Sequence, residues 1–308
     1  MSGIGVVLNP NSKSYKKNPA KLDHMAFIVG DKASCKPTDD IDDLYRVADE
    51  FKSRTIDILA ISGGDGTIHC TLTAFLKVYG EKPLPKITLL RGGTLNTIAA
   101  TMGIHGTTEQ LLSRLLIRYH EDMPFTEKKL RLMNINGSYG CIWGCGVIAA
   151  FMDNYYKHAN LNPFIAAKTL AESIFSAVIN GRVAREMFDR FDAEVEVDGQ
   201  KWAFANYTAL FAASIRQFGL NFNVFHHMLQ QNEKFHAYGI SMPPRTLIPL
   251  LKKMHDGRPS HSEYVLDQIA EKMTITLGKP LRYTIDGDML GPADKFEIQK
   301  GPELTVLV

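Results

Sequence analysis

Two glycine-rich segments contain the residues of this chain best suited to hold a phosphate group. They span residues 62–67 (Ser-Gly-Gly-Asp-Gly-Thr) and 91–94 (Arg-Gly-Gly-Thr), and each follows an apolar run and precedes a helical pattern. Glycine lets the backbone approach phosphate oxygens, and the free N–H groups and dipole of a following helix attract an anion. Thr67 and Thr94 add hydroxyl donors at the helix starts. The pattern predicts a phosphate site, although two tight strand-to-helix turns would use the same glycines.

Asp65 lies between the glycines of the first segment. A carboxylate at this place would repel phosphate unless it holds a cation or orients water. Magnesium prefers one or two carboxylates together with phosphate oxygens and water, so a magnesium role suits the position. An Asp at a helix start also serves as an N-cap, and the two roles are compatible.

The elements that must position these segments alternate between strand and helix. The expected strands cover residues 4–8, 25–29, 56–61 and 87–90, and the expected helices cover about 40–54, 67–79, 96–102 and 108–119. This alternation predicts a parallel sheet covered by helices on both faces. Ligands of such sheets bind beyond the carboxyl ends of the strands, which is where both glycine-rich segments lie.

The pattern changes near residue 125. Hairpins are expected at 129–143, around an Asn-Gly turn, and at 193–211, around an Asp-Gly turn. Further short strands are expected at about 234–240, 272–277, 281–285, 294–299 and 303–308, with helices at about 149–190 and 244–255. These patterns predict an α/β domain over residues 1–125 and, over residues 126–308, an antiparallel β-rich domain with a helical insertion.

The composition is that of an ordinary globular protein. Of the 308 residues, 45% are hydrophobic and 22% are charged, and a formal net charge of +2 gives no indication of a nucleic-acid partner. No run reaches the roughly 18 apolar residues of a membrane span, and the N-terminus lacks the basic segment of a signal peptide. Four scattered cysteines are too few for a disulfide scaffold. We expect a cytoplasmic protein with reduced thiols.

Three histidines come closest to a metal-binding pattern outside the glycine-rich segments. They are His226, His227 and His236, and the sequence offers no carboxylate at ligand spacing beside them. The favoured interpretation is that they occupy ordinary polar positions.

A helix expected over residues 162–180 has a wide apolar side that includes Phe164 and Phe175. Such a side can line an acyl pocket or touch a membrane surface. Packing on its own domain is the favoured interpretation.

Four segments resemble the diacylglycerol kinase catalytic-domain superfamily, which includes sphingosine and ceramide kinases. Residues 63–67 are identical to its glycine-rich signature, and residues 93–96 (Gly-Thr-Leu-Asn) resemble its second loop. Residues 9–12 (Asn-Pro-Asn-Ser) resemble its first loop, and residues 285–288 (Ile-Asp-Gly-Asp) resemble its Asp-Gly-Glu motif. The resemblance runs along the whole chain in order, and it is specific for the superfamily but not for the substrate.

The resemblance implies a three-layer α/β/α nucleotide-binding domain, a β-sandwich-like acceptor-binding domain, and ATP in a cleft between them. It implies an enzyme that transfers the γ-phosphate of ATP, with Mg, to the hydroxyl of a lipid such as diacylglycerol or a sphingoid or ceramide-type lipid. The implied partners are this lipid acceptor and, transiently, a membrane surface, with no nucleic acid.

The resemblance also implies roles for single residues. Asp286 would be the general base, and Asp65 would also be catalytic and would bind the metal. Asp288 would replace the Glu of the motif. The residues that hold the nucleotide would be Asn9, Ser12, Gly63, Gly64, Gly66, Thr67, Gly93, Thr94, Asn96 and Asp288.

Two departures from the family pattern affect the metal site. Thr97 stands where the second loop usually has Asp, and residues 144–148 are apolar where the family often has an acidic residue. Two other interpretations therefore stay open. One is an NAD kinase-like enzyme, which would share the first signature, and the other is a nucleotide-binding regulatory protein on the kinase fold. The acceptor and the oligomeric state are not identified by the sequence.

Overall fold

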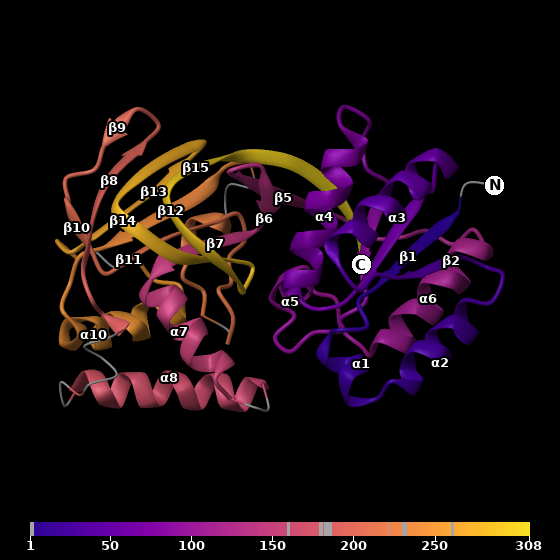
Figure 1. The fold of residues 1–308 in the computed structure, drawn as a ribbon, viewed down its shortest axis with the longest axis horizontal. Helices are drawn as coiled ribbons and strands as arrows, with labels where there is room; N and C mark the ends of the chain where they lie inside the picture. The colour runs from indigo at the N-terminus through magenta and orange to yellow at the C-terminus, as the bar shows by residue number, and fades with distance from the viewer. Residues whose placement is uncertain are drawn as a thin grey trace. The chain divides into compact units, whose positions relative to one another are not determined.

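The computed structural model describes residues 3–158, 161–178, 181, 187–220, 222–229, 233–259 and 262–308. Parts of the helices expected over 149–190 and 162–180 therefore lie outside the described residues. The chain forms two compact units (Figure 1). The first runs to Leu130 and also includes Glu303–Val308, and the second is Arg131–Pro302.

The last six residues were expected in the second domain, but they belong to the first unit. The reason is a strand pairing, because Val306 lies in parallel register with Ile87 of the first unit. The end of the final strand thus extends the parallel sheet.

The first unit alternates strands and helices. Its strands are β1 (Ile4–Leu8), β2 (Ser34–Pro37), β3 (Ile58–Ser62) and β4 (Lys86–Leu89). Its helices are α1 (Lys13–Lys17), α2 (Ala20–Val29), α3 (Ile41–Arg54), α4 (Asp65–Tyr79), α5 (Thr97–Thr101) and α6 (Thr108–His120). The strands pair in the order β4-β3-β1-β2, and all these pairings are parallel, which confirms the predicted parallel sheet.

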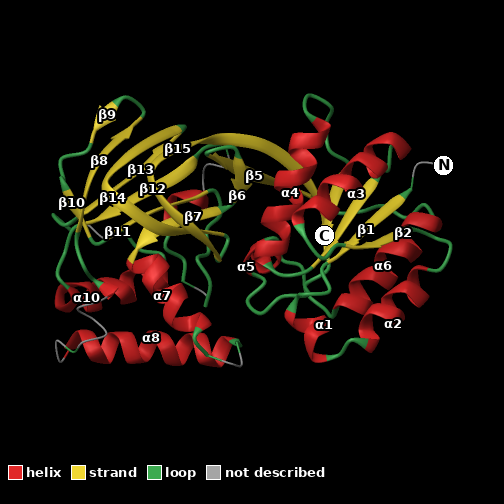
Figure 2. Ribbon diagram, viewed as in Figure 1, coloured by secondary structure: helices red, strands yellow, loops and turns green. Residues whose placement is uncertain are grey.

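Helices cover both faces of this sheet (Figure 2). On one face, Val6 of β1 belongs to the same core cluster as Met25 of α2 and Leu112 of α6. Successive residues of a strand point to opposite faces. On the other face, Gly5 lies so near α3 that an added Cβ would be 2.5 Å from the ring of Phe51. The three-layer arrangement is thus confirmed.

Capping residues mark the starts of helices α3 and α6. Asp40 accepts a hydrogen bond from the N–H of Asp43, at 2.8 Å, and so caps α3. Thr107 and Gln110 form a capping box at the start of α6.

The strand predicted at residues 25–29 is wrong, because these residues end helix α2. Met25 and Val29 are buried one helical turn apart, whereas Phe27 between them is 83% exposed. A five-residue apolar run cannot distinguish a buried strand from one side of a helix. The strand next to β1 is β2 instead, and its Ser-Cys-Lys-Pro sequence has no apolar pattern.

The second unit is rich in strands. Its helices are α7 (Val147–Tyr156), α8 (Pro163–Val178), α10 (Pro244–Asp256) and the 3-10 helix η1 (His226–Leu229). Its strands, of which β5 and β15 extend into the first unit, are β5 (Glu127–Ile135), β6 (Ser138–Gly140), β7 (Ile142–Gly146), β8 (Phe191–Val197), β9 (Gln200–Lys201), β10 (Asn206–Tyr207), β11 (Ala209–Ala213), β12 (Phe235–Ile240), β13 (Val265–Ala270), β14 (Lys272–Ile285) and β15 (Asp288–Leu307).

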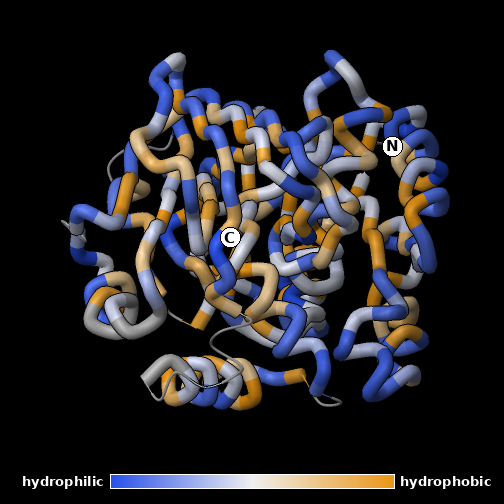
Figure 3. The backbone as a smooth tube through the Cα atoms, turned by 60° about the vertical axis from the view of Figure 1, so that its left-hand side comes forward, coloured by the Kyte–Doolittle hydropathy of each residue, from blue (hydrophilic) through white to orange (hydrophobic). Residues whose placement is uncertain are grey.

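These strands form an antiparallel path in the order β13-β12-β11-β7-β14-β15. Their inward side chains form one hydrophobic core that includes Trp143 and Phe296, whose ring centroids are 4.9 Å apart. Hydrophobic stretches, in orange, alternate with hydrophilic ones, in blue, along the backbone in Figure 3. The antiparallel β structure with helical insertions is confirmed. Two pairs of predicted short strands are joined into the long strands β14 and β15, and β13 was not predicted.

Each of three hairpins has a two-residue loop, and the side chain of the first loop residue accepts a hydrogen bond from backbone outside the hairpin. Asn136, Asp198 and Asp286 are each followed by glycine, and both residues of every pair have positive φ, as type I′ hairpins require. The Asn136 side chain accepts a hydrogen bond from the N–H of Glu297, at 2.8 Å. Asp198 accepts one from the N–H of Lys272, also at 2.8 Å. These turns therefore fix both their own hairpin and the position of a neighbouring strand.

Helix α8 turns its large aromatic residues outward. Phe164 is 76% exposed and Phe175 is 64% exposed, whereas Ala166, Thr169 and Ser173 are buried. The expectation that the apolar side packs within the domain is therefore wrong for these two phenylalanines. Small residues form the packing face where α8 lies against α7 and α10. No helix in the described part of the chain is long and apolar enough to cross a bilayer.

Replacing Gly199 by alanine should lower the free energy of unfolding by about 1–2 kcal/mol, the usual cost of the left-handed conformation for a residue with a Cβ. Gly199 has φ +79°, and an added Cβ would meet no atom within 4 Å, so backbone strain is the expected cause. Urea unfolding measures the change. Gly291→Ala is the matched control, because Gly291 also faces open space but has no positive φ. Equal stability of the two variants would contradict the turn assignment.

Candidate functional site

Three loops meet at the carboxyl edge of the parallel sheet in the first unit. They follow β1, β3 and β4, which are neighbours in the sheet. The loops consist of residues 9–12, 63–64 and 90–96, and the second leads directly into α4. Because the strands run in one direction, all three loops emerge at the same edge.

Hydrogen bonds connect each loop to the next. The Asn9 side-chain amide donates to the hydroxyl of Thr67, at 2.7 Å, and the N–H of Gly92 donates to the carbonyl of Gly63, at 2.7 Å. The structure thus brings together every nucleotide-binding residue that the sequence predicted in this unit. These residues are Asn9, Ser12, Gly63, Gly64, Gly66, Thr67, Gly93, Thr94 and Asn96.

The glycines are required where the loops touch. A Cβ added to Gly93 would lie 2.2 Å from the Cα of Gly64, and one added to Gly63 would lie 2.3 Å from the side chain of Thr67. Real Cβ atoms do not come so close to other atoms. Sequence reasoning gave this space to phosphate oxygens, whereas the structure fills it with the neighbouring loop and side chain.

Both carboxylate oxygens of Asp65 accept hydrogen bonds from backbone amides at the start of α5. Its Oδ2 accepts the N–H of Thr97 at 2.9 Å, and its Oδ1 accepts the N–H of Ile98 at 3.0 Å. The first N–H groups of a helix have no partner within the helix, so this carboxylate caps α5 from a different element. Carboxylate oxygens have further lone pairs, so these two hydrogen bonds leave room for a metal ion. The metal role of Asp65 stays a prediction.

The second loop is held in shape by Asn96. This residue has φ +50°, and its side chain accepts the N–H of Gly93 at 2.9 Å and donates to the Gly93 carbonyl at 3.1 Å. Helix α5 that follows has only five residues. The second loop therefore supports the first, and the start of α4, a helix of 15 residues, is the stronger anion site.

The donor groups around the start of α4 fit an anionic phosphate. Thr67 accepts its hydrogen bond from Asn9, so its own hydroxyl proton is available to a ligand. The Ser12 hydroxyl and the Nε of Arg91 are buried without a hydrogen-bond partner among the described residues. Lys13 follows Ser12, and burial and the nearby Lys17 lower its pKa. Residues 9–12, 63–64 and 90–96 contain no carboxylate, and Asp65 directly follows the second of these loops.

Asp286 and Asp288 belong to the second unit, at the hairpin between β14 and β15. Asp286 is buried, and its carboxylate accepts the N–H of Cys141 at 3.0 Å and the N–H of Ile142 at 2.7 Å. Both amides belong to the same unit as Asp286, and its role as general base stays a prediction. Asp288 pairs with Ile285 and closes the hairpin.

Two residues near Asp286 were missed by sequence reasoning. An added Cβ on Gly140 would lie 2.9 Å from the Asp286 carboxylate, so glycine is needed for the approach. The hydroxyl of Tyr156, on α7, donates to the carbonyl of Gly287 at 2.7 Å. Neither residue belongs to a sequence motif. Each contacts the Asp286-Gly287 turn in the folded structure, which the local sequence does not reveal.

Known structures share this fold. One is the crystal structure of a diacylglycerol kinase from Bacillus anthracis str. Sterne. It superposes with a TM-score of 0.67 at 14% identity, and the superposition covers 99% of this chain and 96% of that chain. Two further solved structures from the same strain give TM-scores of 0.71 and 0.70 at 13% and 14% identity, each with 99% of this chain covered. The two superpositions include 96% and 97% of the neighbours' own chains. Identities this low establish the fold alone. No curated protein matches significantly.

The family comparison concerns the first unit. The model of the diacylglycerol kinase catalytic domain matches residues 3–126. This range contains the three loops and both glycine-rich segments, and it ends near the close of the first unit at Leu130. Residues 3–126 are therefore similar to the catalytic domain of diacylglycerol kinases.

Proposed function

We propose that this protein is an ATP-dependent lipid kinase that transfers the γ-phosphate to a hydroxyl of a lipid such as diacylglycerol or a sphingoid or ceramide-type lipid. The observation that carries the proposal is the convergence of three strand-end loops at the start of α4, within the range that matches the kinase family. Phosphoryl transfer requires mainly positioning and charge neutralisation from the protein. The donors in these loops suit that task.

In this proposal the triphosphate lies against the first turn of α4. The Thr67 hydroxyl and the Ser12 hydroxyl donate to its oxygens, and Arg91 supplies positive charge. Gly93, Thr94 and Asn96 shape the second loop beside it. Magnesium, held through Asp65, would neutralise phosphate charge. The proposed acceptor-side residue is Asp286, which takes the proton of the lipid hydroxyl, with Asp288 beside it in the hairpin.

Contact with a membrane surface is part of the proposal, because a lipid acceptor resides there. The exposed rings of Phe164 and Phe175 on α8 support it. Large aromatic side chains on one side of a surface helix favour the boundary between headgroups and acyl chains.

The first prediction concerns nucleotide binding. Thr67→Val keeps the shape of the side chain but removes the hydroxyl, so ATP affinity measured by calorimetry should fall about tenfold or more, as expected for a hydrogen bond to a charged group. Thr71→Val is the matched control, because Thr71 is buried one turn further along α4 and its hydroxyl has no partner among the described residues. Equal ATP affinity in the two variants would remove Thr67 from the binding site.

The second prediction concerns magnesium. ATP should bind the unaltered protein more tightly with Mg²⁺ than without it, and Asp65→Asn should reduce this difference. The variant also loses one acceptor for the amides of α5, so a thermal melt must show that it stays folded. A wild-type ATP affinity that is independent of Mg²⁺ would rule out the metal role.

The third prediction concerns the base. Asp286→Asn should leave ATP affinity nearly unchanged and lower the transfer of label from γ-labelled ATP into a lipid extract by about 10²–10⁴-fold, the usual contribution of a general base. Asp198→Asn is the matched control, because Asp198 has the same turn and also binds two successive backbone amides.

The assays of these two variants and of the unaltered protein together separate the remaining interpretations. Equal turnover would make Asp286 a structural turn residue. Absence of any transfer by the unaltered protein, with ATP still bound, would favour the nucleotide-binding regulatory protein. Transfer to NAD instead of lipid would favour the NAD kinase-like enzyme.

A further inference from the structure

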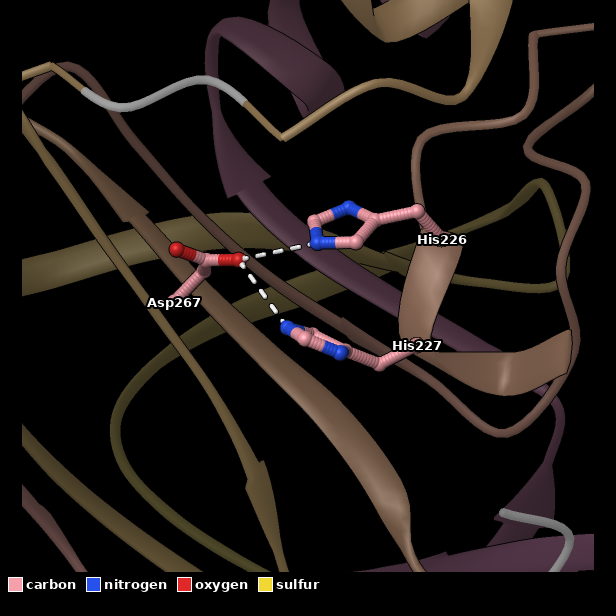
Figure 4. Close-up of side chains that lie close together, drawn as sticks. All are labelled: His226, His227 and Asp267. Carbon is pink, nitrogen blue, oxygen red and sulfur yellow. Dashed lines mark ion pairs between the residues drawn. The ribbon is translucent and has the colours of Figure 1, made fainter. Parts of the chain in front are cut away.

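Histidines and a carboxylate converge on one side of the sheet in the second unit (Figure 4). His226 and His227 come from η1, and Asp267 comes from β13. One oxygen of Asp267 lies 3.7 Å from Nε2 of His226 and 3.9 Å from Nε2 of His227. Ligand atoms of all three side chains lie within 4.8 Å of one another.

These distances approach those of ligands around one small ion. In a tetrahedral zinc site with metal–ligand bonds of about 2.0–2.1 Å, two ligand atoms are about 3.4 Å apart. Each His–Asp separation exceeds this value by only a few tenths of an ångström. Small side-chain rotations would therefore suffice to bind an ion among the three groups.

A fourth residue, His236, holds the carboxylate in place. His236 on β12 is fully buried, and its Nε2 lies 3.1 Å from the same oxygen of Asp267. Strands β12 and β13 are antiparallel, with His236 opposite Ile269, so His236 and Asp267 are diagonal neighbours on one face of the sheet. Supporting bonds of this kind orient the ligands of metal sites.

The donor set also suits a cation. Asp267 supplies a carboxylate oxygen, and His226 and His227 each supply an imidazole nitrogen, which are ligand atoms that zinc takes in proteins.

We propose that His226, His227 and Asp267 form a binding site for a divalent transition-metal ion, zinc above all, with His236 as the residue that positions Asp267. Imidazole nitrogens favour zinc, copper, nickel or iron over magnesium and calcium, which prefer oxygen ligands. The bound ion would tie η1 to the edge strand β13. This site is separate from the phosphate-binding loops and does not depend on the kinase proposal.

Sequence reasoning placed these histidines in ordinary polar positions, because no carboxylate stood at ligand spacing. The structure corrects the premise of that interpretation. Asp267 lies 31 residues beyond His236 in the sequence, and it reaches the histidines through the pairing of β12 with β13.

Binding of cobalt and zinc to the purified full chain tests the site. Co²⁺ should give the visible absorption bands of a low-symmetry site with nitrogen ligands, and Zn²⁺ should displace it at one equivalent. In His227→Ala and Asp267→Asn, zinc affinity measured by competition with a chromophoric chelator should fall at least about tenfold. His227 is 46% exposed, so its replacement should leave the fold intact.

His255→Ala is the matched control, because His255 also lies beside an aspartate, at 3.2 Å from Asp256, but near the end of helix α10 with a side chain that is 52% exposed. It should bind zinc as the unaltered protein does. Zinc should also raise the melting temperature of the unaltered protein and of His255→Ala, but not of His227→Ala. The proposal is overturned if the unaltered protein does not bind Zn²⁺, or if folded His227→Ala binds it with unchanged affinity.

Discussion

The close contact between the two glycine-rich segments is the constraint on which the three strand-end loops of the first unit depend. An added Cβ on Gly93 would lie 2.2 Å from the Cα of Gly64, so a side chain there would separate the loops. Their contact brings Asp65 to the amides of Thr97 and Ile98. The carboxylate then satisfies donors that a helix start leaves without partners. In the proposed function, loops fixed by such contacts would hold the Thr67 and Ser12 hydroxyls in place before phosphate binds, which is the condition for electrostatic stabilisation.

The same turn arrangement occurs at three hairpins of the second unit. A residue with positive φ stands before glycine, and its side chain binds the backbone of another strand, as Asp198 does with Glu271 and Lys272. Asp286 has the same arrangement with Cys141 and Ile142. The geometry of Asp286 is therefore not by itself evidence of catalysis. Asp286 differs from Asp198 in being buried, and a buried carboxylate interacts more strongly with any nearby proton donor.

The histidine cluster concerns a different part of the second unit. Strand β13 ends the antiparallel path, and an edge strand is held by a partner on one side only. His226 and His227 on η1 approach this strand at Asp267. An ion at that point would add a cross-link where the sheet has fewest backbone hydrogen bonds. The three strand-end loops belong to the first unit, so the two proposed sites have no residue in common.

The sequence by itself determined the alternating elements, the hairpin turns and the loops of the first unit. Glycine, Asn-Gly and helix-capping residues act within a few positions along the chain, so their local pattern predicts the backbone. It did not determine helix α2, because a run of five apolar residues suits either a strand or one side of a helix. Nor did it reveal the amide partners of Asp65 and Asp286, or the meeting of Asp267 with the histidines. Only the tertiary structure decided these contacts, because they join residues far apart in the sequence through strand pairing and loop packing.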